Sequence, residues 1–255
     1  MFSGKISFFA AQSERAQTAK RQLEDLYGSV DQKEADVIVA LGGDGLMLQA
    51  LHHFMNSNKP IYGMRMGTVG FLMNDFSIHD LLDRLSMAGT NLIQPLMMEA
   101  LDSQGTKQYR RAFNEVSLWR QTCQAARIRV FVDEVMRLEE LICDGILVST
   151  PAGSTGYNLS ARGPVIPLCV PLLAISPISP FRPRHWRGAL LRDKSSIRIE
   201  VLDHEKRSVG SSADHHEVRN CIEVNIWQDT KSSSSLMFDQ NYSWEERILA
   251  EQFKC

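Results

Sequence analysis

The sequence predicts two domains, an α/β domain with a Rossmann-like parallel sheet followed by an all-β sandwich. Three observations carry this prediction. Three short apolar segments near the N-terminus are each followed by apolar residues at helical spacing. After residue 91 the chain changes to short, partly alternating segments separated by turn-forming residues. A length of 255 residues with 44% hydrophobic positions suits two domains that each bury a core, and it excludes a disordered chain.

The first domain is predicted from alternating strand and helix patterns. Residues 5–10, 37–41 and 61–64 are short and apolar enough for buried strands of a parallel sheet. A helix is predicted after each strand from apolar positions at helical spacing. The first set is Ala16, Ala19, Leu23 and Leu26. The second is Leu48, Leu51 and Met55, with Pro60 ending the helix, and the third is Leu81, Leu82 and Leu85, with Ser77 and Asp80 as a capping box.

The second domain is predicted from its strand-like segments, and the pattern at the end of the chain does not show which domain that end packs against. The segments are 110–119, 127–132, 145–149, 197–202 and 222–227. Residues 232–235 form a serine run that indicates a flexible end, and Ser243 with Glu246 is a capping box for a last helix from Trp244 to Phe253. The expected divisions are therefore 1–98, 99–235 and a tail at 236–255.

Charge and cysteine content restrict the functional classes. The formal net charge of −2 gives no overall basic field, so nucleic acid is not an expected partner. The five cysteines never form a C-x-x-C pair, which is typical of free thiols in a reducing cytoplasm. No apolar run approaches the length of a membrane span, and His215-His216 lacks the spacing of a zinc site, so we expect a soluble intracellular protein without a metal cage.

The GGDG sequence at 42–45 is the first candidate site. It follows a predicted buried strand and precedes a helix, at the edge where open α/β sheets bind ligands. Glycines let backbone amides approach phosphate oxygens, and the helix directs its positive end to the same place. Asp44 beside a phosphate would bind Mg²⁺ or accept a proton from a hydroxyl nucleophile. An ordinary tight turn is the alternative reading of these four residues.

Three further segments offer binding groups. The run from Asp144 to Ser160 leads from a strand into small and hydroxyl residues that can surround a ligand with hydrogen bonds, although loops that join strands share this composition. Asn114 and Glu115 lie side by side in a predicted strand and therefore on opposite faces, where an amide could pair with adenine and a carboxylate with ribose, or both could be ordinary surface groups. The turn from Gly67 to Phe71 could bring an aromatic ring against a base.

These motifs, in this order and spacing, resemble the NAD kinases, which phosphorylate the adenosine 2′-hydroxyl of NAD with ATP or, in some members, polyphosphate. The resemblance covers nearly the whole chain and rests on GGDG at 42–45, GxxGFL at 67–72, Asn-Glu at 114–115 and the block from Asp144 to Ile166. It implies an α/β first domain, a β-sandwich second domain, a tail that crosses back to the first, and a homodimer or homotetramer.

The resemblance also implies roles for individual residues. Asp44 would be the general base and Gly45 a phosphate contact, while Asn114 and Glu115 would hold adenine and ribose. Asp144 would lie at the nicotinamide end. The remaining implied ligand contacts are Phe71, Ala152, Thr155, Gly156, Tyr157, Asn158, Leu159, Ser160 and, through the family's late DG-x motif at Asp214-His215-His216, His216. ATP with Mg²⁺ is the implied donor.

Some residues depart from the family pattern, and two other functions stay open on the sequence. Leu46 replaces the threonine that usually follows GGDG, Arg65 replaces an asparagine, and Gly156 replaces an alanine, which only removes a methyl group. A lipid kinase of the diacylglycerol-kinase type also carries GGDG, but the polar wall at 149–160 favours a soluble acceptor. A non-catalytic dinucleotide sensor would use Asp44 only to hold ribose hydroxyls.

Overall fold

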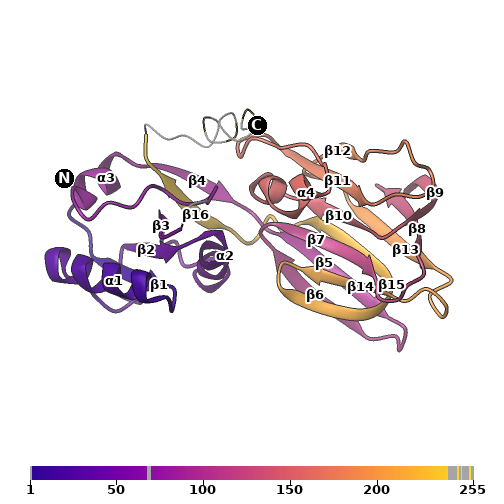
Figure 1. The fold of residues 1–255 in the computed structure, drawn as a ribbon, viewed down its shortest axis with the longest axis horizontal. Coiled ribbons are helices and arrows are strands. Elements are labelled where there is room, and N and C mark those ends of the chain that lie inside the picture. The colour runs from indigo at the N-terminus through magenta and orange to yellow at the C-terminus, as the bar shows by residue number, and fades with distance from the viewer. Residues whose placement is uncertain (1, 68–69, 241–245, 247, 249–252, 254–255) are drawn as a thin grey trace. The chain divides into compact units, whose positions relative to one another are not determined.

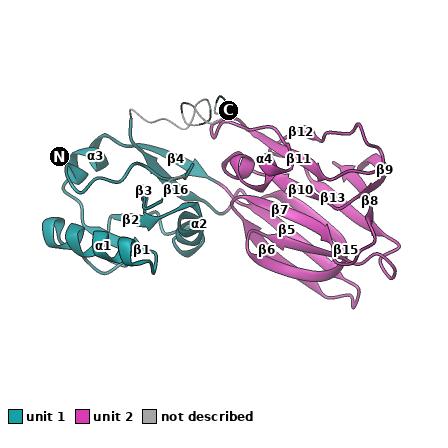
Figure 2. Cartoon of the chain, viewed as in Figure 1, with its two compact units in different colours: residues 1–93, 232–255 teal, residues 94–231 magenta. Residues whose placement is uncertain are grey.

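The computed structural model describes residues 2–67 and 70–240, together with positions 246, 248 and 253. The chain forms two compact units, and each is described here by itself. Unit 1 comprises residues 1–93 and 232–255, and unit 2 comprises residues 94–231 (Figure 2). The units divide a few residues earlier at both places than the divisions expected from the sequence.

Unit 1 is built on a mainly parallel sheet with the strand order β1-β2-β3-β16-β4 (Figure 1). β1, β2, β3 and β16 run parallel, and β4 pairs antiparallel with β16. The first three are the strands predicted from apolar runs, and every residue of β2 is buried. The bounds are Ile6–Ala10 for β1, Val37–Gly42 for β2, Ile61–Arg65 for β3, Gly89–Ile93 for β4 and Ser234–Phe238 for β16.

Helices cover both faces of this sheet. Alternate β2 residues pack with α1 (Glu14–Tyr27) and α3 (Leu81–Met87) in one apolar cluster. On the other face lies α2 (Asp44–His53), where a Cβ on Gly63 of β3 would come within 2.3 Å of Met47 Cε. Glycine in β3 therefore lets the helix that follows GGDG pack closely on the sheet.

The three helices predicted within residues 1–98 exist, but several of their details differ from the prediction. Leu26 is 58% exposed because it lies in the last turn of α1, beyond the buried stripe of Ala16, Ala19 and Leu23. α2 ends at His53, well before Pro60, and buries Met47, Ala50 and Leu51, whereas Leu48 is only half-buried. The capping box at α3 is also wrong, because Asp80 is itself the N-cap residue with a left-handed backbone, and the Ser77 hydroxyl accepts from the His79 amide.

The serine run is ordered, contrary to the flexible end predicted from its composition. Ser232 and Ser234 are buried, and the Ser234 hydroxyl donates to the Leu51 carbonyl at 2.9 Å. The run leads into β16, which inserts between β3 and β4. The chain thus returns to the sheet of unit 1 as a strand. The predicted helix from Trp244 to Phe253 and its Ser243 cap lie outside the described residues, apart from isolated positions.

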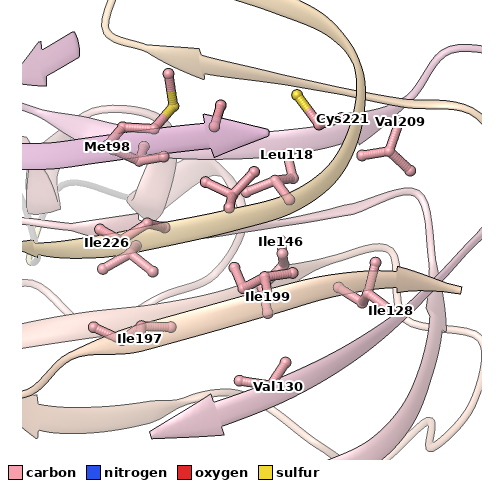
Figure 3. Close-up of a cluster of buried hydrophobic side chains, with 14 of the residues drawn as sticks. Met98, Leu118, Ile128, Val130, Ile146, Ile197, Ile199, Val209, Cys221 and Ile226 are labelled. Atoms are coloured by element: carbon pink, nitrogen blue, oxygen red, sulfur yellow. The ribbon is translucent and has the colours of Figure 1, made fainter. Parts of the chain in front are cut away.

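Unit 2 is a sandwich of antiparallel strands around one apolar core. Its strands follow the order β12-β11-β10-β7-β14-β15-β13-β8-β9, and β5 pairs with β15 and β6. The first part of the long β15 pairs with β14, and its second part pairs with β5 and β13. One strand therefore takes part in three strand pairings. Alternate residues such as Ile128 and Val130 of β8 point inward and meet Ile197 and Ile199 of β13 (Figure 3).

The bounds of the elements of unit 2 are as follows: β5 Leu96–Asp102, β6 Lys107–Ala112, β7 Glu115–Arg120, β8 Ala126–Val132, β9 Val135–Cys143, β10 Gly145–Ser149, the short 3₁₀ helix Ala152–Thr155, α4 Tyr157–Ser160, β11 Leu172–Ile178, β12 Ala189–Arg192, β13 Ile197–Leu202, β14 Val209–Ala213 and β15 His216–Gln228. The predicted strand at 110–119 is thus two strands, β6 and β7, interrupted at Phe113 and Asn114. In the described part of the chain, no helix has the length and apolar character needed to cross a bilayer.

Candidate functional site

The GGDG turn joins β2 to α2 in unit 1. Gly42 ends the strand, Gly43 is the N-cap and Asp44 is the first helical residue. A Cβ placed on Gly43 or Gly45 would meet no atom within 4 Å, so both glycines face open space. The first backbone amides of a helix point out of its N-terminal end and attract anions. The turn therefore combines an exposed amide-rich end with one carboxylate.

The Asp44 carboxylate is held by the segment that follows β3. Its Oδ2 accepts from the Phe71 amide at 2.8 Å, and its Oδ1 accepts from the Leu72 amide at 2.9 Å. The Met66 amide also donates to the Gly42 carbonyl at 2.7 Å. A carboxylate oxygen has two lone pairs, so each oxygen can still accept one further hydrogen bond. The sequence predicted both motifs, and the structure shows that Asp44 bonds one to the other.

Asn114 and Glu115 lie together in unit 2, at the interruption between β6 and β7. A Cβ on Gly156 would be 3.6 Å from Glu115 Oε2 and 4.0 Å from Asn114 Nδ2, so both side chains reach the same glycine. The expectation that they lie on opposite faces of a strand was wrong, because Asn114 precedes the start of β7. Asn114 Oδ1 and Glu115 Oε2 are buried and have no hydrogen-bond partner among the residues that the structure describes.

Burial changes the chemistry of Glu115. Desolvation, and secondly the negative charge of Asp214, raise the pKa of the Glu115 carboxyl to about 7. Buried polar atoms in folded proteins are nearly always hydrogen-bonded, so two adjacent acceptors without partners are unusual. A perturbed carboxyl beside an unpaired amide oxygen is the pattern of a ligand site.

Much of the hydroxyl-rich block is used inside the protein. The Thr150 hydroxyl donates to the Phe113 carbonyl at 2.6 Å, and Ser154 Oγ bonds to the backbone of Pro151 and Ile166. A Cβ on Gly153 would lie 2.2 Å from the Asn114 carbonyl oxygen. Only glycine fits there, so these small residues pack the 3₁₀ helix directly against the Asn114 backbone.

The predicted ligand-wall residues divide into inward and outward groups. Asn158 is fully buried, and its amide bonds to the Ser154 and Pro164 carbonyls and the Ser176 hydroxyl. Its side chain therefore supports the loop. Ala152 is also buried. Thr155 is half-buried, and the residues exposed on α4 and at its start are Gly156, Tyr157, Leu159 and Ser160.

Tyr157 connects the acidic groups of unit 2. Burial, followed by the charges of Glu115 and Asp144, raises the pKa of the Tyr157 hydroxyl. Asp144 lies between β9 and β10 and accepts from Arg120 Nε at 2.6 Å. Tyr157 and Ser160 also line a cavity of about 290 Å³ with Arg162, Trp186 and Arg187. Two exposed residues of α4 thus line a cavity whose wall also includes two arginines.

His216 begins β15, next to the turn that carries Asp214. Its ring lies 4.1 Å from that of His215, centroid to centroid. Because β14 pairs with β7 on one side and β15 on the other, Ala213 is opposite both Val116 and His216. The turn therefore sits at the same sheet end as Asn114 and Glu115. Sequence reasoning had left Asp214 without a role, although its carboxylate contacts three backbone amides there.

Three arginines with an open role are held in ion pairs. Arg65 pairs with Asp75 at 2.6 Å, and Arg127 and Arg129 pair with neighbouring acidic residues of unit 2. The described residues contain no cluster of three His, Cys, Asp or Glu side chains arranged to hold a metal ion.

Comparisons with known proteins agree across both units. Residues 3–85 match the family model described as the ATP-NAD kinase N-terminal domain, and residues 114–235 match the ATP-NAD kinase C-terminal domain. An NAD kinase of Brucella suis is 50% identical over 98% of this chain and 97% of its own length. An NAD kinase of Rhizobium meliloti is 51% identical over 97% of this chain and 96% of its own length.

Solved structures show the same fold. Yeast NADH kinase complexed with NADH superposes with a TM-score of 0.76 at 24% identity, covering 87% of this chain and 68% of that one. An NAD kinase from Archaeoglobus fulgidus in complex with ATP gives a TM-score of 0.74 at 20% identity, covering 96% and 97%. These likenesses confirm the two-domain fold predicted from the sequence, and the curated relatives favour NAD kinases over lipid kinases.

Proposed function

This chain belongs to the ATP-NAD kinase family and is an enzyme that phosphorylates NAD, and we propose that it transfers the terminal phosphoryl group of ATP to the adenosine 2′-hydroxyl to give NADP. The family models match parts of both units, and the relatives at about half identity are matched over nearly their full length. The roles of individual residues, the metal and the assembly are part of the proposal.

The unpaired acceptors of unit 2 carry the assignment of the acceptor site. Asn114 Oδ1 and Glu115 Oε2 are buried beside Gly156 without partners in the described part of the chain, so a ligand that binds there should bring hydrogen-bond donors. Adenosine offers an exocyclic amine and ribose hydroxyls. An asparagine amide can pair with an adenine edge, and an ionised carboxylate accepts from hydroxyl groups. Asn114 therefore holds the base and Glu115 the ribose.

Asp44 is the proposed catalytic base. Two backbone amides hold its carboxylate, and each oxygen retains a lone pair that can accept the proton of the reacting hydroxyl. The start of α2, with Gly45, supplies amides for phosphate oxygens. Mg²⁺ bound to ATP would neutralise part of the phosphoryl charge. The protein's contribution is mainly to position and orient the groups.

The other contacts follow the family resemblance. Phe71 lies against the dinucleotide, Asp144 lies at its nicotinamide end, and the exposed positions Thr155, Gly156, Tyr157, Leu159 and Ser160 form the wall with the backbone of Ala152 and Asn158. His216 extends this wall from the start of β15. We also propose a cytoplasmic homodimer or homotetramer.

A product assay tests the proposed function. Purified protein with ATP, Mg²⁺ and NAD should form NADP phosphorylated at the adenosine 2′ position, which mass spectrometry and hydrolysis by a 2′-specific phosphatase would identify. Polyphosphate replaces ATP in a parallel reaction to define the donor. NAD binding without product under any donor and divalent metal would indicate a sensor. Phosphorylation of diacylglycerol in vesicles, with none of NAD, would indicate a lipid kinase.

A further inference from the structure

The turn between β14 and β15 grips the segment that carries Asn114 and Glu115. The Asp214 carboxylate accepts from three successive backbone amides, those of Phe113 at 2.8 Å, Asn114 at 3.0 Å and Glu115 at 3.3 Å. In the opposite direction, the Asp214 amide donates to the Glu115 carbonyl at 3.1 Å. Four hydrogen bonds therefore join this one residue to the segment.

This grip explains why β6 and β7 are separate strands. In an extended strand, successive amides point to opposite sides, so three in a row cannot converge on one anion. The chain bends at Phe113 and Asn114, and the three amides meet the carboxylate. Asp214 itself has a left-handed backbone with a φ of 52°, which is uncommon outside glycine and is tolerated best by Asn and Asp. A partly buried, charge-assisted contact offsets that cost.

We propose that Asp214 is a positioning residue of the dinucleotide site, which fixes the backbone of residues 113–115 so that the side chains of Asn114 and Glu115 present their unpaired acceptors to the adenosine. The proposal rests on the function proposed for those two residues. Asp214 itself need not contact the ligand. The conformation of the segment depends on a carboxylate about one hundred residues away in the sequence.

Asp214 also has an electrostatic effect that a residue with a purely structural role would lack. The charged group that acts on Glu115 is Asp214 from the β14–β15 turn, and Glu115 and Asp144 in turn act on Tyr157 of α4. The negative charge of Asp214 adds to burial in raising the pKa of Glu115. Removing that charge should lower this pKa and extend the ionised form of Glu115 to lower pH.

The test is Asp214→Asn in the full-length enzyme, with NADP formation measured against NAD concentration from pH 5.5 to 8.5. We expect the KM for NAD to rise about tenfold and kcat to stay within about twofold, because one neutral amide oxygen cannot replace a carboxylate with three donors. The value of kcat/KM should fall as Glu115 becomes protonated. Its midpoint should lie near 7 in the wild type and roughly half a unit lower in the variant.

Asp133→Asn is the matched control. Asp133 lies in another hairpin turn of unit 2, has a φ of 51°, and accepts from the Ser196 amide at 2.9 Å. This variant makes the same chemical change in the same kind of turn and should alter neither the KM nor the pH midpoint. Circular dichroism and urea unfolding establish that each variant is folded.

Asp214→Glu keeps the negative charge and lengthens the side chain, so it distinguishes the effect of charge from that of side-chain length. It should also raise the KM, because the longer side chain misplaces the carboxylate, but it should keep the midpoint of the wild type. It also serves as the test if Asp214→Asn does not fold. An unchanged KM in Asp214→Asn, or a raised KM with an unmoved midpoint, would overturn the proposal. A wild-type enzyme that makes no NADP would instead reject the proposed function.

Discussion

Asp44 in unit 1 and Glu115 in unit 2 show two opposite ways to place a functional carboxylate. Asp44 begins a helix, and backbone amides of Phe71 and Leu72 bind both of its oxygens. Glu115 begins a strand, and its Oε2 is buried with no partner within residues 2–67 and 70–240. The first group is oriented before any ligand arrives. The second is left unsatisfied, at a cost to stability, and a ligand with hydroxyl groups would relieve that cost.

The largest expected effect comes from Asp44→Asn. The amide can still accept one backbone hydrogen bond, but it cannot accept a proton, so we expect kcat to fall by about 10² to 10⁴ while the Kd for NAD stays within a few-fold. Steady-state NADP formation and calorimetric titration with NAD measure the two quantities. Asp31→Asn is the control, because Asp31 also accepts a backbone amide in unit 1, from Lys33. Turnover near that of the wild type would reject Asp44 as the base.

The second-largest expected effect comes from Gly153→Ala, at the place where the 3₁₀ helix packs against the Asn114 backbone. A methyl group on Gly153 would overlap the Asn114 carbonyl, with 2.2 Å between the two atoms. Gly153→Ala should therefore destabilise the protein by about 2 to 4 kcal/mol and weaken NAD binding, because backbone atoms cannot move aside as a flexible side chain can. Urea unfolding at pH 7.5 measures the stability.

Gly156→Ala is the control for that change. Its Cβ would lie 3.3 Å from the Gly153 carbonyl oxygen and 3.6 Å from Glu115 Oε2, and its φ of −89° is negative. The free energy of unfolding should change by less than about 1 kcal/mol. Equal losses in the two variants would show that the close approach at Gly153 has no special importance.

Part of the fold and part of the candidate site could be predicted from the sequence. Buried β-branched runs predicted the parallel strands, and the glycines of GGDG predicted a turn at the correct strand end. The block from Asp144 to Ser160 was predicted to surround a ligand with hydrogen bonds, but its composition does not reveal that Thr150, Ser154 and Asn158 turn inward. Inward and outward hydroxyls have the same residue types, and only the neighbours that they bond to separate them.

Long-range contacts account for the remaining errors. The serine run looked flexible because small polar residues have little apolar surface, yet Ser234 is buried once β16 occupies the gap between β3 and β4. The bend at Asn114 depends on Asp214, and the sequence of residues 110–119 alone does not predict it. The role of Glu115 came from a family resemblance, whereas its missing partner and raised pKa are properties of the folded chain.

Glu115→Gln should make the protein more stable at high pH and less active. The pKa of Glu115 is about 7 in the folded state and 4.5 without burial, so the folded state binds more protons between these values. Its free energy of unfolding therefore falls as pH rises through that window, and the penalty is complete above pH 7. The advantage of the variant should be larger at pH 8 than at pH 5 by about 2 to 3 kcal/mol.

Glu99→Gln provides the contrast for this measurement. Hydrogen bonds from Tyr109 and then Lys107 lower the pKa of Glu99, so its ionised form stabilises the folded state. Urea unfolding at both pH values should show that this variant gains nothing at pH 8 relative to pH 5. An advantage of Glu115→Gln that does not depend on pH would contradict an unsatisfied, half-titrated carboxyl.

The smallest effect, proton release on NAD binding, addresses the comparison most directly. At pH 7 about half of the free enzyme carries a proton on Glu115, and ribose hydroxyls favour the ionised carboxylate. Binding of NAD without ATP should therefore release about half a proton, which calorimetry in buffers of different ionisation enthalpy can measure. Glu115→Gln should abolish the release and Asp44→Asn should retain it. Proton release that is lost in Asp44→Asn and kept in Glu115→Gln would contradict the roles given to the two carboxylates. The proton released on NAD binding would then come from the carboxyl that is bonded to backbone amides.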